Sequence, residues 1–253
     1  MAKIVAIANQ KGGVGKTTTA VNLSTCLAAK GKRVLLVDCD PQGNATSGFG
    51  VNKSELERTI YDVLVNGSSA QETVKRTEYK VNLLPSNIEL AGAEIELVAA
   101  ISRETRLKRA LDPVREEYDY IFIDCPPSLG LLTLNSLAAA DSVLMPIQCE
   151  FYALEGVSQL MNTIQLVRNN LNQNLAVEGV LMTMYDSRTN LAEQVVKEVR
   201  ENFGDVVYHT MIPRNVRLSE APSYGQPILI YDKRSRGSEE YMNLAKEVIK
   251  RGK

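Results

Sequence analysis

The chain has 253 residues, of which 44% are hydrophobic, and its formal net charge is −1. This length is enough to bury a full core, while the balanced charge excludes a protein that attracts nucleic acid through its global field, so any DNA site must be a local basic patch. No run approaches about 18 consecutive apolar residues and no signal-peptide pattern precedes the first strand, so we expect a cytoplasmic protein without stable membrane association.

Apolar runs of strand length alternate with amphipathic helical stretches along the chain. This alternation predicts βαβ crossovers, and hence an α/β fold with a mostly parallel twisted sheet flanked by helices on both faces. We expect a single domain over residues 1–253 with no N-terminal helix-turn-helix domain. The predicted strands are 4–8, 33–38, 81–85, 120–124, 142–147, 177–184 and 206–212, and the predicted helices are 17–30, 88–101, 104–117, 129–139, 155–171, 190–203 and 238–251.

A glycine-rich loop joins the first strand to the first helix. Such a loop points backbone N–H groups at a ligand, with the positive end of the helix dipole behind them, and this geometry binds phosphate. Lys16 is predicted to reach the β- and γ-phosphates and Thr17 to hold Mg²⁺. A plain tight turn and a dinucleotide-binding loop remain as alternatives, although a dinucleotide fingerprint has Gly or Ala at the position of Thr18. The loop consists of Lys11, Gly12, Gly13, Val14, Gly15, Lys16, Thr17 and Thr18.

The loop departs from the usual G-x-x-x-x-G-K-[ST] pattern, because Gln10 takes the first glycine position and a second lysine, Lys11, follows. This variant resembles the deviant Walker A motif of the ParA/MinD family of ATPases. The resemblance implies that the cofactors are ATP and Mg²⁺ and that residues 11–18 bind the nucleotide. It also gives Lys11 a role in trans, in which it reaches the partner's phosphates across a nucleotide-sandwich homodimer.

Carboxylates end two of the other predicted strands. Ligands of an open parallel sheet lie at the carboxyl ends of its strands, so Asp124 fits a Walker B residue that holds Mg²⁺, usually through water. Asp38 and Asp40 are two residues apart, so in an extended chain they share a face and can both approach the γ-phosphate. Asp40 fits the role of orienting the attacking water. A solvated turn is the alternative for the segment after Asp40.

Both acidic segments also resemble the same family. The V-D-x-D-P-Q-G-N segment is similar to switch I of ParA-type ATPases, which assigns the hydrolytic aspartate to the position of Asp40. The segment ending in Asp124 is similar to their Walker B and switch II region, with Phe122 in place of an aliphatic residue.

Two later loops extend the predicted site. Residues 212–222 resemble the adenine-side loop of the family, which implies that Pro213 and Asn215 contact the base; the residues alone indicate only a loop. Glu150 follows the predicted strand 142–147 at the same sheet edge, and we expect it to meet Lys11 across a dimer.

Basic residues cluster only weakly in the second half of the chain. By themselves they are typical of a solvated surface. The resemblance to chromosomal ParA proteins implies that Arg188 and Arg217 bind DNA without sequence preference. A dimer doubles each patch on one face, so that phosphate contacts become sufficient only when both subunits join.

The C-terminal helix and the cysteines each allow two interpretations. Tyr241, Leu244 and Val248 recur at helical spacing among basic residues, and such a helix can lie on a membrane, but we expect it to pack on the sheet. The four cysteines form no C-x-x-C pair, so we expect buried reduced thiols, with a metal cluster shared across a dimer as the alternative. They are Cys26, Cys39, Cys125 and Cys149.

The resemblance covers essentially the whole chain and is closest to short chromosomal ParA proteins of the Soj type. It implies a Mg²⁺-dependent ATPase of chromosome or plasmid partitioning. Its ATP dimer is expected to bind non-specific double-stranded DNA, and hence the nucleoid, until a ParB-type centromere-binding partner stimulates hydrolysis. The alternatives are a MinD-like membrane-surface ATPase of division-site placement, a metal-cluster reductase that shares the loop, and a nucleotide-controlled binding module with negligible turnover.

Overall fold

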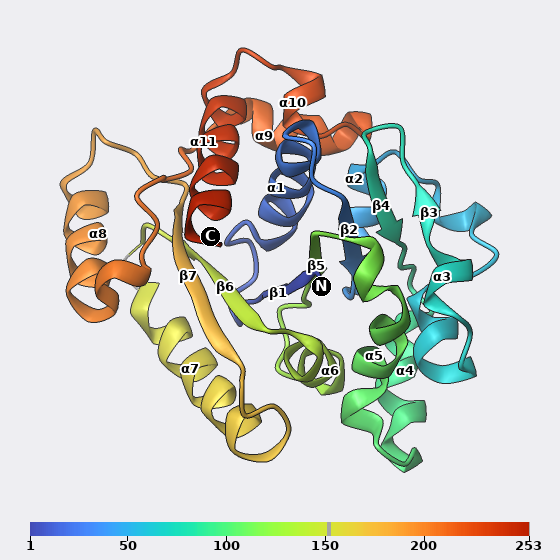
Figure 1. Cartoon of the computed structure of the whole chain (residues 1–253). Helices are drawn as coiled ribbons and strands as arrows, with labels where there is room; N and C mark the ends of the chain where they lie inside the picture. Colours follow the sequence, from blue (N-terminus) through green and yellow to red (C-terminus); the bar gives the residue numbers. More distant parts are fainter. Residues whose placement is uncertain (151–152, 253) are drawn as a thin grey trace.

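The computed structural model describes residues 1–150 and 153–252 (Figure 1). Within this part, the strands form one sheet in the order β3-β4-β2-β5-β1-β6-β7, in which only β3 runs antiparallel to its neighbour. The predicted mostly parallel sheet is therefore confirmed. The strands are β1 (Lys3–Ile7), β2 (Val34–Asp38), β3 (Lys75–Arg76), β4 (Val81–Leu84), β5 (Tyr120–Asp124), β6 (Ser142–Gln148) and β7 (Ala176–Thr183).

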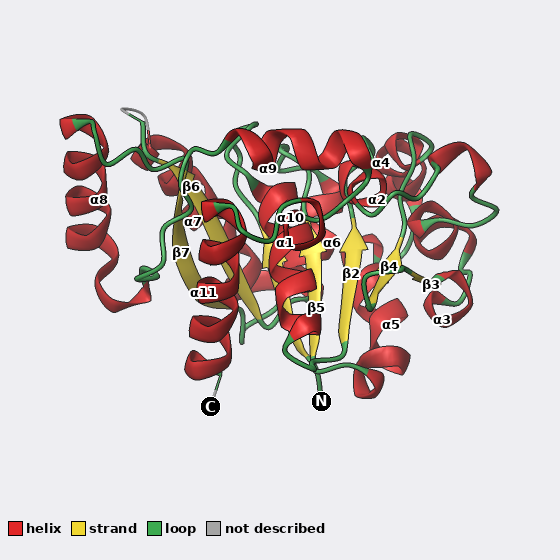
Figure 2. Ribbon diagram, turned by 90° about the horizontal axis from the view of Figure 1, so that it is seen from above, coloured by secondary structure: helices red, strands yellow, loops and turns green. Residues whose placement is uncertain are grey.

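Helices cover both faces of the sheet, as Figures 1 and 2 show. Because both faces are covered, β2 and β5 are buried at every position and their sequences are continuous apolar runs ending in aspartate. One face carries α1 (Lys16–Ala29) and α11 (Arg236–Arg251), with the short α2 (Asn44–Gly48), α9 (Val216–Glu220) and α10 (Ile228–Tyr231) beside them. The other carries α4 (Leu90–Glu96), α5 (Arg106–Leu111), α6 (Leu131–Ala139), α7 (Ala153–Asn170) and α8 (Asn190–Phe203).

The remaining elements are short. They are α3 (Ala70–Thr73), the π-helical turn η2 (Asp62–Asn66) and six 3-10 helices: η1 (Lys53–Glu55), η3 (Leu97–Ala99), η4 (Arg103–Thr105), η5 (Asp112–Glu117), η6 (Gly204–Val206) and η7 (Ala221–Tyr224).

Local sequence signals place the ends of the longer helices. Gly31, at φ +82°, follows α1 in the left-handed region that glycine adopts without steric cost. The Thr189 hydroxyl accepts a hydrogen bond from the Ala192 N–H at the start of α8, and the Ser235 hydroxyl does the same for Ser238 in α11. These are the N-cap contacts that satisfy otherwise unpaired backbone donors.

The C-terminal helix packs against the protein, as expected. Tyr241, Leu244 and Val248 are buried, and the Tyr241 hydroxyl lies 3.2 Å from the Thr19 hydroxyl of α1. None of the helices in the described residues is both long and apolar enough to span a membrane. The four cysteines are buried and form no disulfide, in agreement with the prediction.

One predicted strand does not form, and two predicted helices are shorter than expected. Residues 206–212 lie along the edge of β7 with one isolated bridge, Val180 to Val207, and single backbone hydrogen bonds, and therefore form no strand. The predicted helix 104–117 is broken into α5 and a 3-10 helix, because Pro113 cannot continue an α-helix. The predicted helix 88–101 shortens to α4 and η3. The two residues of β3 carry no apolar alternation that would predict a strand.

Close packing beside β7 makes Gly179 necessary for stability. A Cβ at this position would lie 2.5 Å from the Tyr208 ring and 2.9 Å from the Val206 carbonyl oxygen. Tyr208 is fully buried, and the Arg251 guanidinium lies 4.2 Å from its ring centroid, so the ring cannot move aside freely. We expect Gly179→Ala to lower the free energy of unfolding by about 1–3 kcal/mol, measured by urea denaturation.

Gly92→Ala in α4 is the matched control. Its added methyl meets only side-chain atoms, the nearest being Glu96 Oε1 at 3.2 Å, and alanine is favoured within a helix by about 0.5–1 kcal/mol. Wild-type stability of the Gly179→Ala protein would contradict the packing described for β7.

Candidate nucleotide-binding site

The sheet order brings the three sequence motifs to one edge. The glycine-rich loop follows β1, Asp124 ends β5 and the Asp38 segment ends β2, and β5 lies between the other two strands. Asp124 is in register with both Ile7 and Asp38. In Figure 2, β2 and β5 run toward the same edge, where α2, α4 and α9 also lie. The convergence expected from strand ends is therefore present in the fold.

The glycine-rich loop has the backbone geometry of a phosphate cradle. Gly13 and Gly15 have φ values of +74° and +88°, and Gly15 is the N-cap residue directly before α1. Only glycine adopts such φ values without strain, and the loop ends directly at the helix N-terminus. Lys16 is buried, and its Nζ donates a hydrogen bond to the Lys11 carbonyl oxygen at 3.0 Å. Burial lowers the pKa of Lys16, while the negative charge of Asp124 opposes that shift.

Asp124 is a buried carboxylate that lacks the partners such a group normally has. Neither of its oxygens has a hydrogen-bond partner with ordinary geometry, although the Thr17 hydroxyl is near enough to lower its pKa. Burial, with Asp38 nearby, outweighs that effect and raises the pKa of Asp124 well above its usual range. An unsatisfied buried carboxylate beside a threonine hydroxyl fits a divalent cation.

The cation would need oxygen ligands from outside the chain. Among the described residues, no three His, Cys, Asp or Glu side chains are grouped closely enough to hold a metal ion. Mg²⁺ usually takes one or two protein ligands and completes its shell with phosphate and water. Thr17 and Asp124 therefore suit Mg²⁺ that arrives with a nucleotide.

Asp38 and Asp40 have different environments. The Asp38 Oδ2 atom accepts hydrogen bonds from the Thr46 N–H and hydroxyl, both at 2.7 Å, so this carboxylate holds α2 against β2. Burial raises the pKa of Asp38 to about 6, against the lowering effect of the Thr46 bonds. The Asp40 Oδ1 atom accepts one bond from the Gln42 N–H. The Asp38 carboxylate is therefore occupied by Thr46, and the expected approach of the two acids to the γ-phosphate stays a prediction.

The sequence did not predict the residues that hold the Asp38 to Asp40 segment in place through hydrogen bonds. The Ser86 hydroxyl donates to the Asp40 carbonyl oxygen at 2.9 Å, and the Ser86 N–H donates to the Thr46 hydroxyl at 2.9 Å. Ser86 follows β4, so the rule that ligand-side residues follow strand ends could have identified it. At the end of β7, the Thr183 hydroxyl donates to the Val14 carbonyl oxygen of the glycine-rich loop at 2.8 Å.

The adenine-side residues predicted from the resemblance line a cleft of about 350 Å³ beside Gly15 and Thr18. Pro213 and Asn215 both contribute to it. The Asn215 side-chain oxygen accepts bonds from two N–H groups at the start of α9, so only its amide nitrogen remains for a base. Met184, at φ +50°, lines the same cleft in a strained backbone conformation that sequence did not predict.

Lys11 pairs with Glu150 within one chain. Its Nζ lies 3.0 Å from Glu150 Oε2, and the Gln148 side chain also donates to Glu150. The structure shows this pair within a single chain, and the expected contact across a dimer stays a prediction. The side chains are partly exposed, so water and salt screen the ion pair.

The two arginines predicted to bind DNA also carry acidic partners. Arg188 forms a bidentate pair with Asp186, with Nη2 at 2.7 Å from Oδ2, and this contact lowers the pKa of Asp186. Arg217 lies 2.9 Å from Glu220 and 3.6 Å from Asp232.

The loops that carry these arginines are neighbours in space. The Arg214 N–H donates to the Tyr185 carbonyl oxygen, and the Tyr185 N–H donates to the Ile212 carbonyl oxygen. Two segments far apart in sequence are therefore held together at this edge of the sheet.

Comparison with known proteins agrees with these features. The family model of the AAA domain matches residues 2–177. The sporulation initiation inhibitor protein Soj of Bacillus subtilis (strain 168) is 63% identical over 253 residues, which cover 100% of both chains. The chromosome partitioning protein ParA of Myxococcus xanthus (strain DK1622) is 57% identical over 250 residues, covering 98% of this chain and 88% of that protein.

A solved structure of similar shape contains a nucleotide. Cobyrinic acid a,c-diamide synthase from Mycobacterium smegmatis, with bound ATP analog and magnesium, has a TM-score of 0.88 and 38% sequence identity, and the match covers 100% of this chain and 96% of that chain. Identity above one half over at least 98% of this chain and 88% of each relative, together with the second lysine of the glycine-rich loop, decides the family. The chain belongs to the ParA/MinD family of deviant Walker A P-loop ATPases, and within it to the ParA (Soj) group.

Proposed function

We propose that this chain is a Mg²⁺-dependent ATPase of chromosome or plasmid partitioning. The observation that carries the proposal is the buried, unpartnered carboxylate of Asp124 beside Lys16 and Thr17. Residues 12–18 hold the phosphates, Thr17 and Asp124 hold the cation, and Pro213 and Asn215 contact the base. Bound Mg²⁺ supplies neutralisation of phosphate charge.

Hydrolysis in such a site depends on positioning. Phosphoryl transfer needs little covalent help from protein, so an oriented water and fixed positive charges provide most of the catalysis. Asp40 orients the water, and its backbone is fixed by the bond from Ser86. Lys16 acts within its own chain, and Lys11 acts on the nucleotide of a second copy. Lys11 therefore exchanges Glu150 for a phosphate when the homodimer forms.

We further propose that the ATP-bound homodimer binds non-specific double-stranded DNA on the nucleoid. Arg188 lies in the loop before α8 and Arg217 lies in α9, and the Tyr185 and Arg214 backbone bonds hold the segments before them together, which supports one basic surface per subunit. DNA phosphates replace Asp186 and Glu220 as the anionic partners of these arginines. Hydrolysis, stimulated by a ParB-type centromere-binding protein, breaks the dimer and releases the DNA.

The structure gives less support to a MinD-like membrane function. A membrane-surface helix presents its apolar side to lipid, whereas Tyr241, Leu244 and Val248 of α11 are buried against the protein. The described residues therefore favour binding to DNA over binding to a membrane.

Two variants test the nucleotide site, one through its loss of ATP binding and the other through its loss of hydrolysis. Lys16→Ala removes a buried cation from the phosphates, and we expect ATP affinity to fall by about 2–5 kcal/mol. Asp40→Ala should retain ATP binding and dimerisation while hydrolysis falls by about two to four orders of magnitude. Binding of a fluorescent ATP analogue and phosphate release measure the two effects. Normal turnover of the Asp40→Ala protein would remove Asp40 from its role.

Charge reversal at Arg188 tests the proposed DNA surface. Binding of non-specific duplex is measured in the Asp40→Ala background, first with ATP and then with ADP. Arg188→Glu should weaken binding of non-specific duplex at least tenfold and reduce the slope of log K against log salt by about two, because each dimer loses two phosphate contacts. Arg200→Glu, an exposed position near the far end of α8, is the control. Dimerisation with unchanged DNA affinity in Arg188→Glu would place the DNA surface elsewhere.

Removal of the acidic partner of Arg188 is expected to raise DNA affinity, whereas Arg188→Glu is expected to lower it. Asp186→Asn removes the carboxylate that competes with DNA phosphates for the guanidinium. We expect its DNA affinity at moderate salt to rise severalfold, since exposed ion pairs contribute up to about 1 kcal/mol. A fluorescence anisotropy titration measures the change, and weaker binding would argue that Asp186 orients Arg188 for DNA.

A further inference from the structure

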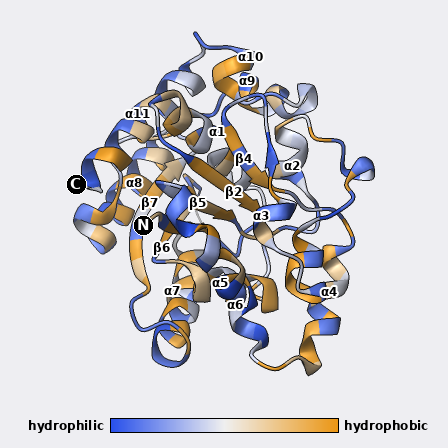
Figure 3. Cartoon of the chain, turned by 45° about the vertical axis from the view of Figure 1, so that its right-hand side comes forward, coloured by the Kyte–Doolittle hydropathy of each residue, from blue (hydrophilic) through white to orange (hydrophobic). Residues whose placement is uncertain are grey.

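An exposed apolar strip runs along α4 and the turn that follows it. Ile88, Ile95, Val98 and Ile101 are exposed by 66%, 78%, 59% and 89%. Ile95 and Val98 are three residues apart in α4 and η3, a spacing that places their side chains on a common side, and Ile101 lies in the turn that follows. In Figure 3, hydrophobic stretches continue along α4 and beyond it at the rim of the molecule. Contiguous exposed aliphatic side chains of this kind mark an interaction surface.

The segment that carries this α4 strip also contacts both loops around the nucleotide site. At its start, Ser86 bonds to the Asp40 backbone and to Thr46. Farther along, the Glu94 carboxylate lies against Gly130, the residue before α6, so closely that a Cβ at Gly130 would overlap it. One Glu94 oxygen is buried without a hydrogen-bond partner. The segment that carries the α4 strip therefore contacts the Asp40 backbone through Ser86 and the loop after Asp124 through Glu94.

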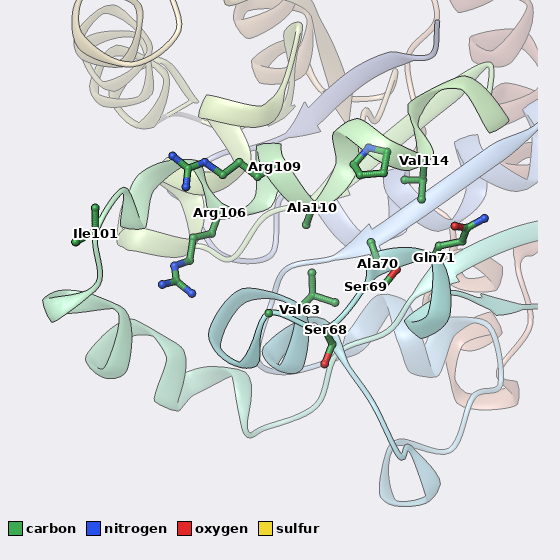
Figure 4. Close-up of a pocket in the computed structure, with 12 residues that line it drawn as sticks. Val63, Ser68, Ser69, Ala70, Gln71, Ile101, Arg106, Arg109, Ala110 and Val114 are labelled. Atoms are coloured by element: carbon green, nitrogen blue, oxygen red, sulfur yellow. The ribbon is translucent and has the colours of Figure 1, made fainter.

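Charges of both signs surround the α4 strip. Glu89 and Glu96 lie along α4, whereas Arg106 and Arg109 lie at the Ile101 end. Ile101 and the two arginines line a cavity of about 500 Å³ between α5 and residues 63–71 (Figure 4). Arg109 makes no ion pair among the described residues, so its charge is available to a partner.

We propose that the α4 strip is a contact surface for a second copy of this chain in the ATP-bound dimer. This inference rests on the proposed homodimer and assigns one of its surfaces. In a two-fold dimer the same surface faces itself, so it must be self-complementary. An apolar centre with acidic residues at one end and basic residues at the other satisfies that condition. The position favours the same occupant, because the strip lies beside the loops that a second copy must approach to bring Lys11 to the nucleotide.

Burial of the α4 strip also connects dimerisation to hydrolysis. The second copy presses on the segment 86–101, whose inner contacts are the Asp40 backbone and Gly130. Dimerisation thereby fixes the loop that positions the water, whereas a monomer leaves the outer side of α4 free. The proposed result is an ATPase whose turnover depends on occupancy of the α4 strip.

The test uses the full chain with Asp40→Ala, which traps the ATP-bound state. Ile95→Asp and Val98→Asp each place a charge at the centre of the proposed contact, where burial of an unpaired charge is costly. We expect each to weaken ATP-dependent dimerisation at least tenfold in analytical ultracentrifugation, with unchanged binding of a fluorescent ATP analogue. Leu166→Asp is the matched control, because Leu166 is 63% exposed on α7. It should dimerise like the parent protein.

The possible results separate this inference from the function on which it rests. If the parent dimerises and both α4 variants dimerise equally well, the second copy does not cover the strip and the inference is overturned. Equal weakening by Leu166→Asp overturns it as well, since the effect would then be general. A parent that binds ATP but stays monomeric rejects the proposed dimer itself. In the otherwise native chain, Val98→Asp should also lose hydrolysis at least tenfold while binding ATP.

Discussion

The buried carboxylate of Asp124 is the constraint on which the rest of the site depends. It ends a central strand, in register with both neighbouring strands, and has no ordinary hydrogen-bond partner. A buried charge without partners is costly, so burial raises the pKa of Asp124, and a cation at this position would favour its charged form. Lys16 and Thr17 lie beside it because β1 and β5 are adjacent and parallel. The register of two strands therefore fixes the geometry of the candidate metal site.

A second layer of contacts connects this centre to the surface. Asp38 is fully buried and holds Thr46, which accepts a bond from Ser86, and Ser86 in turn bonds to the Asp40 backbone. The two bonds of Ser86 join segments that are distant in sequence, so the position of Asp40 is a property of the packed fold. The segment after Ser86 continues into α4, whose outer side is apolar and exposed. Asp40 and the α4 strip therefore belong to one connected unit.

The elements predicted well from sequence are those determined by local signals. Continuous apolar runs and glycine positions predicted β1, β2, β5 and the phosphate loop, because both faces of the sheet are covered and Gly13 and Gly15 require positive φ. Residues 206–212 failed because their apolar side chains pack against the edge of β7 without a hydrogen-bond ladder. The pairing of Lys11 with Glu150 of its own chain was not predicted, because sequence does not show which of two identical chains supplies an acidic partner. The roles of Thr46 and Ser86 depend on contacts across the fold.

The bond between Thr183 and Val14 has a consequence for how a single subunit reports its nucleotide state. Thr183 contacts the phosphate loop, and Tyr185, two residues later, holds the Arg214 loop. Asp186 and Arg188 follow directly. A displacement of Val14 can therefore reorient the basic loops through the five residues that follow Thr183. This path lies within one polypeptide, so the surface of a subunit can change when its nucleotide binds, before any association. Dimer formation then adds to a change that a single subunit has already made.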